Sequence, residues 1–336
     1  MGDADAVTAA PASSSSSAAA SDLSVTFRSM ASDVRLWVVG ARPGAQESID
    51  EARAVVERVA STCTRFDPTS ALMQANARGR AWTEVPRETF DAIKAAYDAY
   101  VSTDGLFDPR VLRVLTAYGY DTTLPFEGRT VHLPDATAQP RRSVRSLRRW
   151  KPKFDEDRLA VKVGSEPLDL GGIGKGLAMT WAARYLVDAG AAALVEAGGD
   201  LMALGGGPDG EGWMVGVENP FGGDDPAAVL RLRDRGCATS SIRVRSWKAG
   251  ETDVHHLVDP RTGRSAQAAL RSVTVVGSDP ATAEVWSKSL FVIGKQDIRA
   301  AADDHGLAAV WVDSDGYVGV SRAMRPYVAW QVSRVA

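Results

Sequence analysis

Cysteine is scarce in this chain of 336 residues, and the two cysteines, Cys63 and Cys237, lie far apart with no CxxC pair. Two distant thiols cannot form the dense disulfide framework of a small secreted protein, and they lack the spacing of a thiolate zinc site. An isolated cysteine usually packs as a small apolar residue. We therefore expect two free, buried thiols rather than a disulfide or a zinc centre.

Long apolar runs are also missing. No stretch approaches the roughly 18 consecutive apolar residues that indicate a membrane-spanning helix, so no membrane span is expected. The first residues, MGDADAVTAAPASSSSSAAASD, carry acidic groups where a secretory signal needs basic ones, and they contain no apolar core. We interpret residues 1–22 as a disordered Ala/Ser-rich tail, residues 23–336 as one folded domain, and the protein as cytoplasmic.

An excess of positive charge is absent as well. The net charge is −3 and the pI is about 5.9, whereas proteins that bind nucleic acid through its phosphates are usually basic. A nucleic-acid partner is therefore not expected. One local exception, RRSVRSLRRWKPK at residues 141–153, carries seven basic residues. It could bind an anionic ligand, but a solvated loop or an edge strand protected by basic residues is the favoured interpretation.

The remaining chain shows the periodicities of strands and helices. Alternation in residues 24–40 predicts two short strands, and apolar positions on one face predict a helix over residues 47–60. Three further helices are predicted. One begins after Pro86, one ends at about residue 188, and the last covers residues 279–290. Single strands are predicted for RLAVKV, AALVEAGGD, SVTVVG and a segment after GCATSS. Two hairpins are predicted, one that pairs GWMVGVEN with AVLRLRD and one within LAAVWVDSDGYVGVS. This mixture predicts an α+β fold with mixed or largely antiparallel sheets flanked by helices.

The stretch LDLGGIGKGLAMTWAARYL, residues 168–186, joins a predicted strand to a predicted helix through closely spaced glycines and Lys175. Glycines let a backbone approach a ligand, and the N–H groups at a helix N-terminus suit a phosphate. The spacing is neither that of a P-loop nor that of GxGxxG. Two interpretations stay open: a phosphate-binding turn with Lys175 adding a charge, or a tight strand-to-helix turn within one compact α/β unit.

The segment HHLVDPRTG, residues 255–263, places two of the four histidines of the chain before a turn sequence. His256 has the ordinary pKa of a general base near pH 7, but it could also be a packed core histidine. Asp259 could serve a site or only cap the Asp-Pro-Arg-Thr-Gly turn.

Two further kinds of segment have both a structural and a functional interpretation. FDPTS at residues 66–70 and LFDPR at residues 106–110 each place a Phe beside Asp-Pro, and such a ring could stack on a flat ligand or be buried next to a turn. In ATAEVWSKSL, residues 281–290, Glu284 and Lys288 have the spacing of an ion pair on a helix surface.

In their order and approximate spacing, these segments resemble the ApbE family of FAD:protein FMN transferases. The resemblance covers residues 24–325 and rests on RSMAS, TRFDPTSALMQAN, GLFDP, LDLGGIGKG, LVEAGGDLMALG, ATSS, HHLVDPRTG and SVTVVG followed by AEVWSKSLFVIG. It implies a single α+β domain of two intertwined subdomains. It also implies FAD as substrate, Mg²⁺ as cofactor, and an acceptor protein whose Ser or Thr hydroxyl receives FMN while AMP leaves.

The resemblance also assigns roles to residues. Contacts with FAD are implied for Met30, Phe66, Leu106, Phe107, Asp108, Asp169, Lys175 and Val258. His256 matches the histidine that activates the acceptor hydroxyl. Metal contacts are implied for Gly172, through its carbonyl, and for the last predicted helix, through Glu284, Ser287 and Lys288.

The last helix departs from the family pattern Ala-Asp-x-x-x-Thr, in which the Asp and the Thr bind the metal. Here Glu284 replaces the Asp, Lys288 replaces the Thr, and Arg110 stands where the family has a Thr after FDP. Glu284 keeps an oxygen ligand and Ser287 offers a neighbouring hydroxyl, but a protonated lysine cannot ligate a hard cation. Either Lys288 and Arg110 take over part of the electrostatic task of the metal, or the metal site is rearranged, or the chain binds flavin without transferring it.

Four functions therefore remain open from the sequence. The resemblance favours an FMN transferase. The alternatives are a non-catalytic FAD-binding protein, an FAD pyrophosphatase in which water replaces the acceptor hydroxyl, and a domain that binds another phosphate-containing ligand.

Overall fold

An eight-stranded sheet organises the fold. The computed structural model describes residues 21–122, 124–126, 131–136 and 149–336. In spatial order the strands are β1 (Leu23–Ser29), β2 (Ser32–Val39), β7 (Ala192–Ala197), β8 (Asp200–Gly205), β11 (Arg235–Ser241), β16 (Leu270–Gly277), β17 (Ala308–Asp313) and β18 (Val318–Val320). Each neighbouring pair is antiparallel, so the sheet is built from hairpins and longer returns rather than from parallel crossovers.

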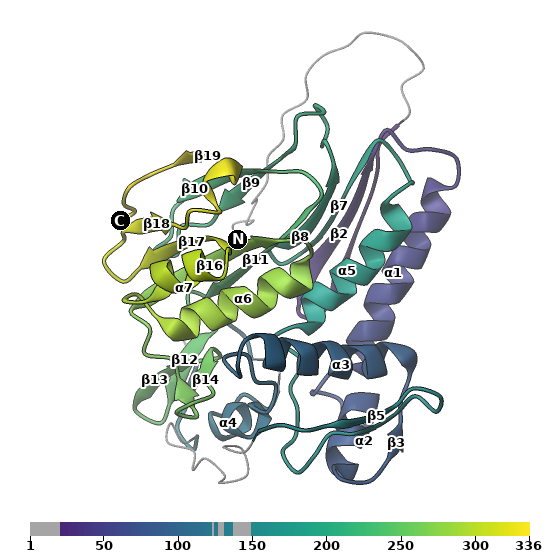
Figure 1. Cartoon of the computed structure of the whole chain (residues 1–336), viewed down its shortest axis with the longest axis vertical. Coiled ribbons are helices and arrows are strands. Elements are labelled where there is room, and N and C mark those ends of the chain that lie inside the picture. Colours follow the sequence, from purple (N-terminus) through teal and green to yellow (C-terminus); the bar gives the residue numbers. More distant parts are fainter. Residues whose placement is uncertain (1–20, 123, 127–130, 137–148) are drawn as a thin grey trace.

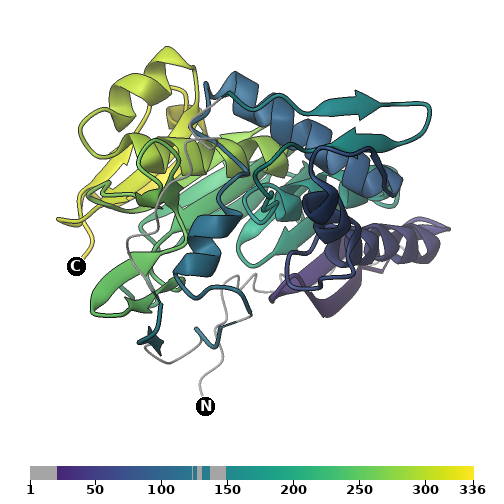
Figure 2. The same ribbon diagram turned by 90° about the horizontal axis from the view of Figure 1, so that it is seen from below.

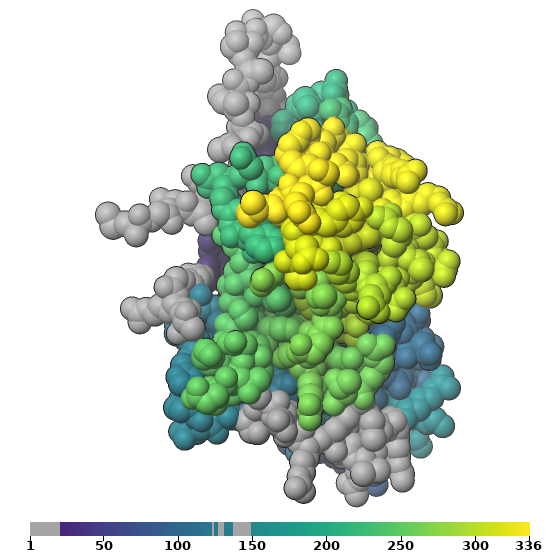
Figure 3. All heavy atoms as spheres, turned by 90° about the vertical axis from the view of Figure 1, so that its left-hand side faces the viewer, coloured from purple at the N-terminus to yellow at the C-terminus, as the bar shows by residue number. Residues whose placement is uncertain are grey.

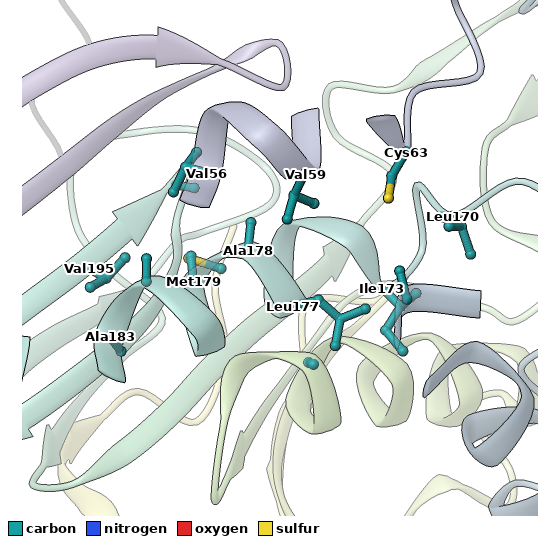
Figure 4. Close-up of a cluster of buried hydrophobic side chains, with 14 of the residues drawn as sticks. Val56, Val59, Cys63, Leu170, Ile173, Leu177, Ala178, Met179, Ala183 and Val195 are labelled. Atoms are coloured by element: carbon teal, nitrogen blue, oxygen red, sulfur yellow. The ribbon is translucent and has the colours of Figure 1, made fainter. Parts of the chain in front are cut away.

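Helices cover one face of this sheet. Helices α1 (Ala45–Thr62), α5 (Gly174–Leu186) and α6 (Pro280–Ile293) run side by side over it, and α7 (Ile298–Asp304) follows α6 (Figure 1). The close-up in Figure 4 shows Val56 and Val59 of α1 facing Ala178 of α5, with Val195 of β7 beside them. Burial of these apolar side chains between helix and sheet stabilises the layer.

A second, three-stranded sheet covers the opposite face. It consists of β9 (Trp213–Val217), β10 (Ala228–Leu232) and β19 (Val328–Gln331), with the short helix η1 (Arg325–Tyr327) before β19. Trp37 of the large sheet meets Trp213 edge to face, with ring centroids 5.1 Å apart. The C-terminal residues, yellow in Figure 3, form one continuous surface with the green middle of the chain. The body therefore has three layers, with apolar clusters on both sides of the central sheet.

A second part of the molecule is inserted between elements of this body. It holds α2 (Ala71–Arg78), α3 (Arg87–Ser102), α4 (Leu112–Ala117), β3 (Thr83–Glu84), β4 (His132–Leu133), β5 (Lys153–Asp155), β6 (Ala160–Lys162), β12 (Ser246–Ala249), β13 (Thr252–His255), β14 (Val258–Asp259) and β15 (Arg264–Ser265). These elements come from two separate stretches of the chain and gather at one end of the body (Figures 1 and 2). The α+β class with two intertwined subdomains is thus confirmed.

Most predicted elements are confirmed, including the first two strands, α1, α3 after Pro86, and both hairpins. Both cysteines are free and buried, as predicted. The described part of the chain contains no helix that is both long and apolar enough to cross a bilayer. The predicted tail, up to residue 20, and the basic run at residues 141–148 lie outside the described residues.

Two predictions about elements are wrong, and one strand was missed. A strand does follow GCATSS as predicted, since β12 begins at Ser246, but GCATSS is itself part of β11, which was not predicted. The small side chains of β11 let α6 pack closely: a Cβ on Gly236 would lie 2.1 Å from the carbonyl carbon of Asp279. Helix α6 is not the last, because α7 follows it. Strand β6 pairs with β3 and β5 in a separate sheet, so the glycine-rich turn connects two sheets rather than one compact α/β unit.

Candidate functional site

A cleft with a volume of about 420 Å³ lies where the two parts of the molecule meet. Its walls come from the β1–β2 turn, the end of α1, the segment before α4, the glycine-rich turn, the loops around β12 and β14, and α6. The predicted site residues that line it are Met30, Phe66, Leu106, Phe107, Asp108, Asp169, Gly172, Lys175, His256, Val258 and Lys288. Segments separated by more than two hundred positions in the sequence therefore converge on one concave surface.

Aromatic side chains line one end of the cleft. Phe66 is 41% exposed and lies 5.8 Å from Tyr120, measured between ring centroids. The guanidinium of Arg65 lies over both rings, 4.1 Å and 4.5 Å from their centroids. An exposed ring held at a fixed angle in a cleft is a surface on which a flat ligand can stack. Met30 reaches the cleft from a two-residue hairpin turn in which it and Ala31 both have positive φ, 49° and 57°.

Arg65 was not singled out from the sequence, yet it anchors the wall of the cleft. Its Nε lies 2.9 Å from Oδ2 of Asp169 in an ion pair, and only 6% and 7% of the two side chains are exposed. Oδ1 of Asp169 accepts from the N–H of Gly171 at 2.6 Å. In the described chain, Nη2 of Arg65 is buried and has no hydrogen-bond partner, a costly state that a bound ligand could relieve. The only sequence signal was its position directly before the Phe66-Asp-Pro turn.

The glycine-rich turn offers a phosphate fewer free amides than its sequence suggests. The N–H of Gly171 is taken by Asp169, that of Gly174 by the carbonyl of Leu170 at 2.7 Å, and that of Gly176 by Oε2 of Glu284 at 3.0 Å. The anion at the N-terminus of α5 is thus the carboxylate of Glu284. Attraction for a ligand phosphate must come mainly from side chains rather than from this row of backbone donors.

Four charged side chains form a buried cluster behind this turn. Oε1 of Glu284 lies 3.1 Å from Nζ of Lys288 and 3.8 Å from Nζ of Lys175. Lys175 also pairs with Asp200, another residue not singled out from the sequence, and Asp200 accepts from the N–H of Thr239 at 2.8 Å. The cluster contains two ammonium groups and two carboxylates, so its charges balance.

Burial alone would raise the pKa of Glu284, but the ammonium groups of Lys288 and Lys175 and the Gly176 N–H outweigh it and hold the pKa below the ordinary glutamate value. Burial alone would lower the pKa of Lys175, but the carboxylates of Asp200 and Glu284 outweigh it and raise the pKa. Glu284 and Lys175 are therefore held in their charged forms by their partners in the cluster.

The surface ion pair predicted for Glu284 and Lys288 is wrong, because Glu284 is only 2% exposed. Helix α6 is covered by α5 on one side and by β11 and β16 on another. Lys288 reaches the cleft, and its Cδ and Cε would lie 3.4 Å from a Cβ placed on Gly172. Ser287 lies away from the cleft: its hydroxyl is fully buried, donates to the carbonyl of Glu284 at 3.0 Å and contacts the hydroxyl of Ser240 at 2.8 Å.

The residues present do not fit a divalent cation. Among the described residues, no group of three or more His, Cys, Asp and Glu side chains is arranged to hold a metal ion. Of the expected side-chain donors, Glu284 is saturated by two ammonium groups and an amide, and Ser287 is turned away. Arg110 makes a two-pronged ion pair with Asp108, and both side chains are 6% exposed.

The two histidines play different parts. His256 lines the cleft, and its Nδ1 lies 3.3 Å from the carbonyl of Arg245. A carbonyl can only accept, so Nδ1 carries the proton and Nε2 is left as the basic atom. Burial, followed by the nearby charges of Arg245 and Lys288, holds the pKa of His256 well below its ordinary value.

His255 is instead a packed histidine. Its Nε2 donates to the carbonyl of Ala266 at 3.1 Å, and its ring meets Phe291 edge to face. Burial lowers the pKa of His255 to about 4. Asp259 serves its turn, because its Oδ1 accepts from the N–H of Arg261 at 2.8 Å. Of this segment, only His256, Leu257 and Val258 line the cleft.

The central sheet, the inserted second part and the cleft between them define a class of α+β protein in which one ligand site is assembled from both parts. The sequence matches the ApbE family over residues 25–311, and the chain belongs to this family. A relative from Salmonella typhimurium, named FAD:protein FMN transferase, is 26% identical over 74% of this chain and 71% of its own. One of the same name from Treponema pallidum is 26% identical over 85% of this chain and 83% of its own.

Solved structures share the fold. The ApbE protein of Thermotoga maritima has a TM-score of 0.76 and 26% identity, covering 91% of this chain and 99% of the other. The flavin transferase ApbE of Vibrio cholerae has a TM-score of 0.74 and 20% identity over the same shares. The fold is therefore that of ApbE proteins.

Proposed function

We propose that the protein is an FAD:protein FMN transferase, which moves the FMN half of FAD to a Ser or Thr hydroxyl of an acceptor protein and releases AMP. Membership of the ApbE family and the names of its relatives support this proposal. The observation that carries it is the placement of His256 in the cleft with its Nδ1 3.3 Å from the Arg245 carbonyl, which leaves Nε2 as the atom to take a proton.

In the proposed step, the acceptor hydroxyl oxygen forms a bond to the phosphorus on the FMN side of the pyrophosphate. The bond from that phosphorus to the bridging oxygen breaks, and the bridging oxygen leaves with AMP. The hydroxyl proton moves to Nε2 of His256. A hydroxyl is a weak nucleophile near pH 7, and a positioned histidine base is the side chain best suited to activate it. The lowered pKa of His256 keeps the base unprotonated before the reaction.

The cleft suits FAD in size and in polarity. Its volume of about 420 Å³ lies within the range of small-molecule sites. Phe66 and Tyr120 offer aromatic faces at one end for a flat ring system, while Lys288, Lys175 and Arg245 bring positive charge to the pyrophosphate. Mg²⁺, which the family resemblance implies, finds no fitting donor set among the described residues. No step is therefore assigned to it.

The test supplies FAD to the purified protein together with a purified acceptor protein that carries an accessible Thr. Release of AMP is followed by chromatography, and the acceptor is weighed by mass spectrometry. We expect AMP to appear together with a mass increase of one FMN on the acceptor. AMP and free FMN without an acceptor would identify a pyrophosphatase. Tight FAD binding without AMP would identify a non-catalytic flavin-binding protein, and no FAD binding would point to another phosphate-containing ligand.

A further inference from the structure

We propose that the ammonium group of Lys288 replaces the divalent cation in this site, so that the protein binds FAD and transfers FMN without a metal ion. The transfer part of this inference rests on the proposed function, but the part about metal binding does not. It is carried by the geometry around Glu284.

The first argument is the saturation of Glu284. Oε2 accepts the Gly176 N–H at 3.0 Å, and Oε1 faces the ammonium groups of Lys288 at 3.1 Å and Lys175 at 3.8 Å. A cation that approached this carboxylate would have to displace an ammonium group or share an oxygen with it. Hard divalent cations need several oxygen ligands, and the second carboxylate of the cluster, that of Asp200, is already paired with Lys175.

The second argument is the balance of charge. The cluster of Lys175, Asp200, Glu284 and Lys288 is neutral and largely buried, with side-chain exposures of 14%, 5%, 2% and 20%. In the protein without FAD, a divalent cation beside Lys288 would add two positive charges that the cluster does not compensate, at a site of low dielectric where like charges repel strongly. The arrangement therefore opposes a metal ion through charge repulsion as well as through the saturation of Glu284.

The third argument is the supply of positive charge to the cleft without a metal. Lys288 lines the cleft with its stem against Gly172. Arg245 also lines the cleft, and in the described chain its guanidinium has no ion-pair or hydrogen-bond partner. Cleavage of a pyrophosphate needs charge neutralisation on the phosphoryl oxygens, and lysine and arginine side chains can supply positive charge there, as metal ions do in other sites.

The test measures metal binding directly. Mn²⁺ is titrated into the FAD complex, and free Mn²⁺ is counted by electron paramagnetic resonance, with FAD alone as the blank. We expect no binding above the blank for the wild type and for Lys288→Met, which removes the charge but supplies no oxygen. Lys288→Thr should bind Mn²⁺ at least tenfold more tightly than either. Lys94→Thr is the matched control, because Lys94 also pairs with a carboxylate, Glu156, but at the surface of α3.

Transfer and FAD affinity are then measured in EDTA and in excess Mg²⁺. We expect both to agree within about twofold for the wild type, and Lys288→Thr to become dependent on added metal. Wild-type binding of Mn²⁺ in the FAD complex, or loss of activity in EDTA with recovery in Mg²⁺, would overturn the inference and leave the transferase proposal standing. Absence of transfer under all conditions would remove the proposed function, while the Mn²⁺ titrations would still decide the role of Lys288.

Discussion

His256 determines how the reaction should depend on pH. Burial and the charges of Arg245 and Lys288 hold its pKa well below the ordinary value in the free protein. A base with a lowered pKa is active above that pKa and becomes inactive as protons bind below it. Since kcat/KM reports the free enzyme, its acidic limb should lie below about pH 6.5 and the profile should be flat from there to about pH 8. A limb centred at the ordinary histidine value would assign the base role to another group.

Removing the same side chain should separate chemistry from binding. His256→Ala is expected to lower kcat for FMN transfer by about 10²–10⁴-fold, because proton transfer in the transition state is lost. The FAD dissociation constant, measured by quenching of flavin fluorescence, should stay within about tenfold of the wild type. His132→Ala, at an exposed position outside the cleft, is the control. Normal transfer by His256→Ala would exclude this residue as the base.

The planar guanidinium group of Arg65 should contribute to FAD binding through its geometry as much as through its positive charge. This group lies over Phe66 and Tyr120 while it forms an ion pair with Asp169, a combination that a lysine cannot reproduce. We expect Arg65→Lys to weaken FAD binding about tenfold, equivalent to about 1.4 kcal/mol, in calorimetric titrations. Arg58→Lys is the matched control, since Arg58 pairs with Glu88 near the surface of α1. Wild-type affinity in Arg65→Lys would reduce Arg65 to a structural role.

At the scale of elements, the crossing of α5 and α6 depends on Gly176. A Cβ there would lie 2.5 Å from the Cα of Ala281, closer than packed atoms approach. Gly176→Ala should therefore force the helices apart and lower the free energy of unfolding in urea by about 1–3 kcal/mol. Gly174→Ala, on the same helix, has no atom within 4 Å of the added Cβ and should not destabilise the fold. Equal effects of the two substitutions would contradict this account of the crossing.

The elements that the sequence predicts well carry local signals. Helix α6 begins where Asp279 accepts from the N–H of Thr282, a cap visible in the sequence as Asp-Pro. Helix α7 has seven residues and no side-chain cap, and it was missed. The spacing of Glu284 and Lys288 alone favours a surface ion pair, whereas the family resemblance places both residues in the site. Only the packing of α5, β11 and β16 around α6 decides that they are buried, and no periodicity within α6 records those neighbours.

For the whole molecule, most of the residues that the family resemblance implies come together in one cleft. Eleven of the thirteen predicted site residues line the cleft; Glu284 lies behind it and Ser287 faces β11. Arg65 and Asp200 were missed because their roles come from partners far away in the sequence, Asp169 and Lys175. Arg245 was missed because only the folded chain brings it to the cleft. Pairings of this kind depend on tertiary structure, and a single sequence gives no direct signal for them.

Because both parts of the molecule form the cleft, FAD should stabilise the protein as one unit. A ligand that binds only the folded state, at about 100 times its dissociation constant, adds about 2.7 kcal/mol. In thermal unfolding followed by circular dichroism in EDTA, we expect a single transition that rises by about 5 °C with FAD. FMN or AMP alone should give smaller shifts, since each would contact only one end of the cleft. An equal shift with FMN alone would mean that the cleft binds only the flavin half, and the pyrophosphate would then not reach Lys288.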